Sequence, residues 1–103
     1  MATTNGNHTL LTLHSVLFNQ LESHGDWRPV RVRVGPHYPP SPSEVPWLME
    51  ELEDHYLLMV RNVDSLVERY TDFETIHPFL DGNGWVGGIV VAAYSHVFMP
   101  QRG

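Results

Sequence analysis

The segment 77–84, His-Pro-Phe-Leu-Asp-Gly-Asn-Gly, constrains the fold of this 103-residue chain more than any other stretch. Pro78 disfavours a helical conformation at the residue before it, so a helix that reaches His77 has to end there. Gly82 and Gly84 allow backbone conformations that other residues avoid, and they allow a ligand to approach the main chain closely. A helix that starts at these glycines would direct its first N–H groups at the same point, which suits a phosphate. The sequence therefore predicts a helix, a glycine loop and a second helix around an anion site.

The same segment carries side chains that suit chemistry on a phosphate. His77 has an imidazole, which can accept a proton near neutral pH. Asp81 has a carboxylate, which is a ligand for a hard divalent cation. Asp-Gly and Asn-Gly pairs are also common turn formers, so residues 81–84 alone would indicate only a chain reversal. The His-Pro-Phe that precedes them favours the phosphate site.

Apolar spacing predicts helices on both sides of this segment. Leucines at positions 10, 13, 17 and 21 predict a helix over residues 10–21, with Gly25 as its stop. A further helix is expected from about Asn62 to Ile76. Residues 85–98 are ambiguous, because an Ile-Val-Val run suits a strand while the wider apolar spacing fits a helix. The glycine loop needs a helix start, which favours a helix here.

Another helix is predicted to start at Ser41 or Ser43. Ser41 is followed by Pro42, and Glu44 lies three residues on, the pattern of a capping box. Its buried face is expected to be formed by Trp47, Leu48, Leu52 and Tyr56. Its solvated face is expected to be the acidic run Glu50, Glu51, Glu53 and Asp54.

A strict apolar-polar alternation predicts a strand, with valines on one face and arginines on the other. Its residues are Val30, Arg31, Val32, Arg33 and Val34. Pro29 precedes this run, and Gly35-Pro36 ends it. The arginines at 28, 31 and 33 form the only cationic cluster of the chain. A solvated strand face and a docking site for an acidic target are equally open interpretations of that cluster.

Composition excludes several classes of function. The formal net charge is −6 and there is no lysine, so a nucleic-acid partner is not expected. Without cysteine there is no disulfide, zinc–thiolate site or cysteine nucleophile. Neither a signal peptide nor a run of membrane-spanning length is present, so we expect a cytoplasmic protein without a membrane partner. The length suits one domain, 1–103.

Residues 77–84 closely resemble the signature of the Fic (Fido) domain family, His-x-Phe-x-Asp/Glu-Gly-Asn-Gly-Arg-x-x-Arg. The resemblance extends from about Leu10 to Val91, through the stretches 13–18, 27–35, 39–52 and 73–76. It implies a mostly α-helical domain with a β-hairpin flap beside the site. It also implies that the chain, a single Fic-like domain over 1–103, is shortened at its C-terminus relative to the family.

The resemblance implies an activity as well: transfer of AMP from Mg-ATP to a Ser, Thr or Tyr hydroxyl of a target protein. His77 would be the general base, and Asp81 would hold Mg²⁺ between the α- and β-phosphates. The anion hole would be formed by Gly82, Asn83 and Gly84. Phe79 would anchor the loop in the core. The flap, residues 30–34, would hold the target by main-chain pairing.

Two departures from the family pattern bear on activity. Trp85 and Gly88 stand where the family has arginines that contact the outer phosphates. Losing two charge-assisted hydrogen bonds costs about 3–6 kcal/mol, or roughly a hundredfold to several ten-thousandfold in rate. The alternative is therefore a non-catalytic remnant that binds a partner or regulates an intact Fic protein by dimerising with it. A third interpretation is an incomplete domain with no function of its own.

The remaining aromatic and imidazole side chains are expected to be structural. Trp47 is assigned to the core, and Trp85 to core packing in preference to stacking on a nucleotide base. His14, His55 and His96 are expected at helix surfaces or boundaries, and no histidine pair has the spacing of a metal site.

Overall fold

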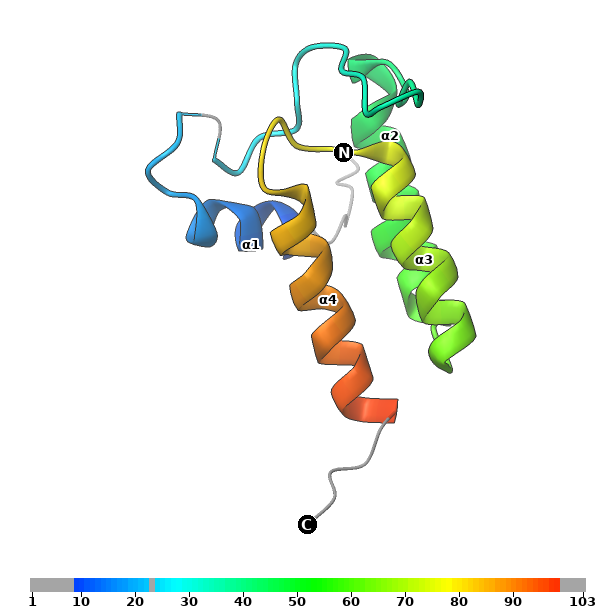
Figure 1. Ribbon diagram of the computed structural model, residues 1–103. Helices are drawn as coiled ribbons and strands as arrows, with labels where there is room; N and C mark the ends of the chain where they lie inside the picture. Colours follow the sequence, from blue (N-terminus) through cyan, green and yellow to red (C-terminus); the bar gives the residue numbers. More distant parts are fainter. Residues whose placement is uncertain (1–8, 23, 99–103) are drawn as a thin grey trace, which may run out of the picture.

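The computed structural model describes residues 9–22 and 24–98. Its four α-helices are α1 (Thr9–Leu17), α2 (Val45–Glu51), α3 (Val63–Ile76) and α4 (Asn83–Phe98). Figure 1 shows α2, α3 and α4 side by side, with α3 and α4 running in opposite directions and α1 lying across the upper part of α4. The mostly helical fold is the one expected. None of the helices described is long and apolar enough to cross a membrane.

The helix starts expected at Ser41 and near Asn62 are confirmed. A 3₁₀ turn, Pro42–Glu44, leads into α2, and its capping box joins the Ser41 N–H to Glu44 Oε2 at 3.1 Å. At α3, Asn62 Oδ1 accepts the Ser65 N–H at 2.9 Å. Both caps satisfy N–H groups that a helix start leaves without partners.

The second helix departs from its expected faces. Its buried side chains are Val45, Met49 and Leu52, whereas Trp47 is 61% exposed, so the assignment of Trp47 to the core is wrong. At about 100° per residue, position 47 faces away from position 45. Beyond Glu51 the chain continues as a π-helical turn, Leu52–Tyr56, and a 3₁₀ turn, 57–59. The side chain of Tyr56 lies outside the described part.

Glu53 was expected in water and is instead buried, with 4% of its surface exposed. Its Oε1 accepts the Leu10 N–H at 3.0 Å, which places the carboxyl group at the N-terminus of α1. Burial raises the pKa of Glu53 to about 7; the Leu10 N–H lowers it in part, and Asp54 adds to the rise. Glu53 lies four residues after Met49, and this spacing is the sequence signal for its place on the buried face.

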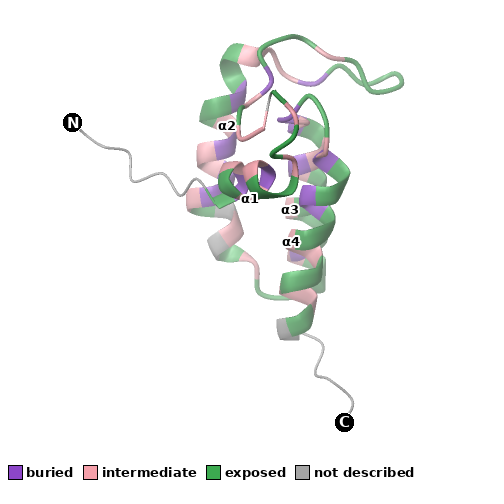
Figure 2. Cartoon of the chain, turned by 90° about the vertical axis from the view of Figure 1, so that its left-hand side faces the viewer, coloured by how far each residue is buried: buried purple, intermediate pink, exposed green. Residues whose placement is uncertain are grey.

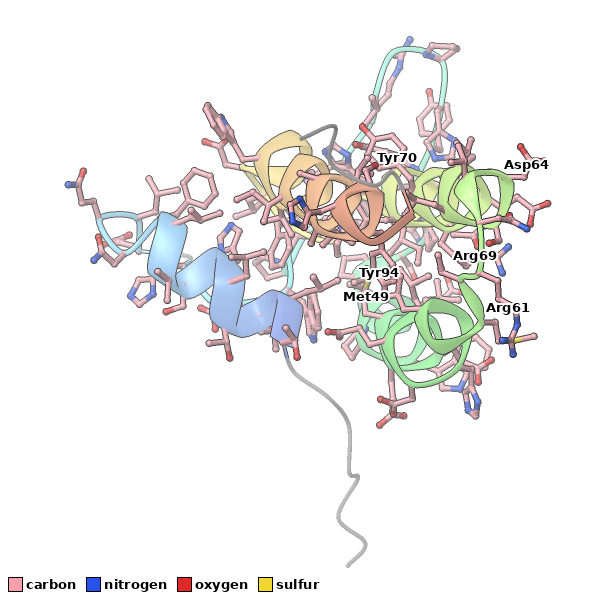
Figure 3. All side chains as sticks on the ribbon, turned by 90° about the horizontal axis from the view of Figure 1, so that it is seen from below. Met49, Arg61, Asp64, Arg69, Tyr70 and Tyr94 are labelled. Carbon is pink, nitrogen blue, oxygen red and sulfur yellow. The ribbon has the colours of Figure 1, made fainter. Side chains whose placement is uncertain are left out.

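The ambiguous last segment is helical, as favoured. Val86 is fully buried, and Gly87 faces the rings of Tyr70 and Phe73, which a Cβ would meet at 3.0 and 3.3 Å. This glycine therefore lets α3 and α4 approach closely. Figure 3, which looks along the bundle from its lower end, shows Met49 and Tyr94 between the helices and Arg61 and Asp64 at the rim. The core comprises Leu10, Val45, Met49, Leu52, Phe73, Ile76, Phe79 and Val86.

The strand predicted over Val30–Val34 does not form, and the described residues contain no regular strand. The segment is extended and mostly exposed (Figure 2). It folds back in a turn over Gly35 (φ 58°), closed by two 2.9 Å hydrogen bonds between Val34 and His37. The hairpin flap is thus reduced to one bridged pair, because no neighbouring strand extends the ladder.

A substitution at Gly88 tests whether α4 is helical in solution. A Cβ at Gly88 would meet no atom within 4 Å beyond its chain neighbours and the backbone of its own helix, so Gly88→Ala should raise the unfolding free energy by about 0.5–1 kcal/mol. Gly87→Ala is the matched control, because its added methyl group meets two rings. This variant should gain less stability than Gly88→Ala, or lose stability. Urea unfolding followed by circular dichroism measures both. A loss of stability in Gly88→Ala would contradict the helix.

Candidate active site

The loop between α3 and α4 holds His77 at the end of a helix. Its backbone is left-handed (φ 50°), and its N–H donates to Phe73 O at 3.0 Å. The helix ends here as predicted, since Pro78 cannot continue it. The side chain is half-buried, and this burial lowers the pKa of His77; Glu74 opposes the shift, while Arg28 and His37 add to it. A lowered pKa favours the neutral imidazole, which is the form that can accept a proton.

Arg28 was expected on a solvated strand face or in target docking, and it is instead 1% exposed. Its Nε donates to His77 O at 2.6 Å, and its Nη2 donates to Ile76 O at 3.0 Å. The last carbonyl groups of a helix have no partner within the helix, and a cation is favoured beside them. Arg28 thus closes the end of α3 directly at His77.

The flap is attached to the same helix end. Arg28 donates from Nη1 to Val30 O at 2.9 Å and from Nη2 to Pro40 O at 2.6 Å, the two ends of a flap that comprises residues 30–40 in the structure. Further along the flap, the His37 Nε2–H donates to Thr75 O at 3.0 Å. The structure therefore brings the flap and the turn that carries His77 together, although neither the alternation in residues 30–34 nor the loop motif predicts this link.

Phe79 anchors the loop from below. It is fully buried, stacked on the His14 ring at 4.0 Å and tilted against Trp27 at 5.4 Å, distances that join ring centroids. Asn83, the first residue of α4, holds Phe79 from above. Its Oδ1 accepts the Phe79 N–H at 2.9 Å, and its Nδ2 donates to Phe79 O at 2.7 Å. Asn83 therefore uses both polar atoms of its side chain to shape the loop.

His14 was expected at a helix surface and is instead 1% exposed beneath the loop. Its Nδ1 accepts the Gly25 N–H at 3.0 Å, so Nε2 carries the proton and donates to Asp81 O at 2.9 Å. The ring is neutral in this arrangement. The sequence signal was its spacing, because His14 lies four residues after Leu10 on the buried face of α1.

Gly82 allows the close approach that the loop requires. Its φ is 86°, and a Cβ here would collide with the ring of Phe18. The Val86 N–H donates to Gly82 O at 3.1 Å, so the amides of residues 83–85 precede the first intrahelical donor. These amides point away from the helix start, as an anion site requires. The Gly82 N–H itself donates to Asp81 Oδ1 at 2.9 Å.

Asp81 is an exposed carboxylate beside this helix start. The described residues contain no group of three or more His, Cys, Asp or Glu side chains that could hold a metal ion. Mg²⁺ in phosphoryl-transfer sites is commonly held by one or two carboxylates together with substrate phosphates. Asp81 therefore fits a Mg²⁺ ion that arrives with a nucleotide better than a resident metal.

Trp85 is 71% exposed, so its assignment to core packing is wrong. With Gly84, Gly88, Ile89 and Ala92 it lines an open hollow of about 430 Å³ against the first turns of α4. None of these five lining residues is charged. The alternative, that the indole stacks on a nucleotide base, stays a prediction.

Two helices joined at a His-Pro-Phe loop, with a helix start at Asp-Gly-Asn-Gly and a flap tied to the histidine, are features of one protein class. The chain belongs to the Fic/DOC family, whose model matches residues 6–95. Among curated proteins it is 29% identical over 105 residues to "Protein adenylyltransferase Fic" of Drosophila willistoni, covering 90% of this chain and 21% of that protein. The protein of the same name from Drosophila grimshawi is 28% identical over 106 residues, covering 90% and 22%. The chain thus spans about a fifth of the length of these relatives.

Proposed function

We propose that this chain transfers AMP from Mg-ATP to a Ser, Thr or Tyr hydroxyl of a target protein, at a rate reduced by the loss of the motif arginines. The observation that carries the proposal is the state of His77: half-buried, with its pKa lowered, in the loop that leads to the start of α4. Membership of the family and the adenylyltransferase name of these relatives support it. The cytoplasmic location expected from the sequence is part of the same proposal.

In this proposal each group has one task. His77 takes the proton of the target hydroxyl, whose oxygen attacks the α-phosphorus, and pyrophosphate leaves. Asp81 would hold the Mg²⁺ of Mg-ATP, and the amides of Asn83 and Gly84 would receive phosphate oxygens. The Gly82 N–H would join them once its hydrogen bond to Asp81 Oδ1 opens. The exposed, largely unpaired main chain of residues 30–34 binds an extended segment of the target.

A second function, a non-catalytic interaction or regulatory module, is favoured by a different observation. The hollow against α4 has an exposed tryptophan and no charged lining residue. Arg28 is committed to four carbonyl oxygens, and Arg69 pairs with Asp72 at 2.9 Å, so neither replaces the motif arginines. In this function the chain would bind a partner, which includes dimerisation with an intact Fic protein.

Transfer of label from ATP separates the two functions. The chain is incubated with ATP labelled at the α-phosphate, Mg²⁺ and cell lysate, and labelled protein is measured after electrophoresis. We expect label with the unmutated chain and a loss of about 10²–10⁴-fold in His77→Ala, the usual contribution of a general base. His77→Asn is the matched control for folding, because asparagine tolerates the left-handed backbone at this position. Equal background from all three proteins would favour the non-catalytic module.

A further inference from the structure

One buried guanidinium connects three segments of the chain. Arg28 donates to Val30 O and Pro40 O in the flap, and to Ile76 O and His77 O at the end of α3. A guanidinium presents its N–H donors in a planar, rigid fork, so these four acceptors are fixed relative to one another. A lysine ammonium has three donors at one point and cannot reproduce this arrangement.

The contact with His77 acts on the backbone that carries the imidazole. His77 is the only residue other than glycine with positive φ among the described residues. Such a conformation persists only where surrounding contacts hold it. The 2.6 Å bond from Arg28 Nε to His77 O is such a contact, and the carbonyl and the imidazole share one Cα. The direction of the side chain therefore depends on Arg28.

The contacts of Arg28 with the flap fix where the flap lies relative to His77. Val30 and Pro40 lie ten residues apart, and both carbonyl groups meet the one guanidinium. The extended segment that begins at Val30 is thus held at a fixed distance from His77. Burial lowers the pKa of His77 most, Glu74 opposes this shift, and the charge of Arg28 lowers the pKa further, which favours the neutral imidazole.

We infer that Arg28 is the positioning residue of this site, which holds the target-binding flap and the proton-accepting His77 in one fixed geometry. This role bears on catalysis only if the chain has the proposed function. Its tests use neither ATP nor a target, so a chain without transfer activity can still confirm it, and an active chain can still contradict it.

Two-dimensional NMR of the ¹⁵N-labelled chain gives the first test. In Arg28→Gln, we expect the pKa of His77 to rise, because a positive charge has been removed. We also expect the Val34 and His37 amides of the flap to exchange at least about tenfold faster, since a lost hydrogen bond raises local opening. In Arg28→Lys the charge remains and the fork is lost, so flap exchange should rise while the His77 pKa stays near that of the unmutated chain.

Arg61→Gln is the matched control, because it removes one exposed positive charge at the rim of the bundle (Figure 3). If Arg28→Gln changes the His77 pKa and the flap exchange rates no more than Arg61→Gln does, Arg28 has no positioning role. The unmutated chain supplies a measurement that does not depend on the variants folding. There, the Arg28 Nε–H should exchange with water as slowly as the Val34 amide. Exchange as fast as that of Arg61 Nε–H would overturn the inference.

Discussion

The double variant Trp85→Arg, Gly88→Arg should transfer AMP at least about a hundredfold faster than the unmutated chain, since two charge-assisted hydrogen bonds contribute about 3–6 kcal/mol. Both positions can accept an arginine without displacing the core. Trp85 is 71% exposed, and a Cβ at Gly88 would meet no atom within 4 Å beyond its chain neighbours and the backbone of its own helix. Placed three residues apart on one helix, both side chains would reach the hollow beside the helix start.

Stability should change little in this variant. Two cations near a helix N-terminus are unfavourable by about 0.3–1 kcal/mol each, which is small beside the expected gain in transition-state stabilisation. Each single variant should give a partial gain, roughly tenfold to two-hundredfold. The label-transfer assay measures all of them at one ATP concentration.

Two controls make the result specific. Adding His77→Asn to the double variant should return transfer to background, because the proton acceptor is lost. The variant Trp85→Lys, Gly88→Lys adds the same charge without the planar fork, so its gain should be smaller. If the double arginine variant gains nothing, the chain lacks other parts of the nucleotide site, and the non-catalytic module becomes the better function.

Glu53→Gln should raise the unfolding free energy at pH 8 by about 1–3 kcal/mol, since a tenfold change in proton affinity between the folded and unfolded chain corresponds to about 1.4 kcal/mol. The carboxyl group has a pKa of about 7 in the fold, against an ordinary value of 4.5. Between these values the folded chain holds a proton that the unfolded chain has released. Stability of the unmutated chain therefore falls as pH rises from 4.5 to 7, and the whole cost is present above pH 7.

Whether Glu53→Gln raises or lowers the unfolding free energy depends on two opposed effects on the ionised Glu53. A carboxylate at a helix N-terminus that accepts a backbone N–H is stabilised, while its burial is destabilising. The raised pKa indicates that burial has the larger effect. Urea unfolding at pH 5, 6, 7 and 8 should show the gain of Glu53→Gln growing with pH. Glu50→Gln, in the preceding helix α2, is the control, because it removes a carboxylate that is not buried. A loss of stability in Glu53→Gln at pH 8 would show that the helix contact has the larger effect.

Local signals in the sequence predicted the start of the second helix and the end of α3, whereas α1 ends at Leu17 and not at Leu21 as expected. The capping box at Ser41 acts within three residues, and Pro78 restricts the residue just before it. The segment 85–98 was undecided by its own spacing, and the requirement of the glycine loop gave the right answer. These predictions depend on short-range chemistry, which a single sequence contains.

The burial of His14, Arg28 and Glu53 could not be predicted in this way. Their hydrogen-bond partners Asp81, His77 and Leu10 lie 67, 49 and 43 residues away in the sequence. A polar side chain is buried where a partner is available, and its own position in the sequence does not reveal that partner. Helical spacing gave a weak signal for two of them: His14 lies four residues after Leu10, and Glu53 lies four residues after Met49.

The predicted strand failed for a related reason. Alternation in residues 30–34 indicates a chain that can be extended, but a strand also requires a neighbour with which to pair. Here the first carbonyl of the segment is taken by Arg28, and only Val34 pairs, with His37. The exposure of Trp47 and Trp85 was missed because each was assigned by residue type and not by its angle around the helix.

The support of the loop by α1 has a consequence for protein engineering. The His77–Gly84 motif looks portable as a sequence, yet Phe18 fills the space beneath Gly82, and His14 bonds to the main chain at Asp81. A graft of the motif into another helical hairpin would leave both contacts behind. Any transplant, or any shortened fragment meant to keep the loop in shape, therefore has to carry the first helix with it.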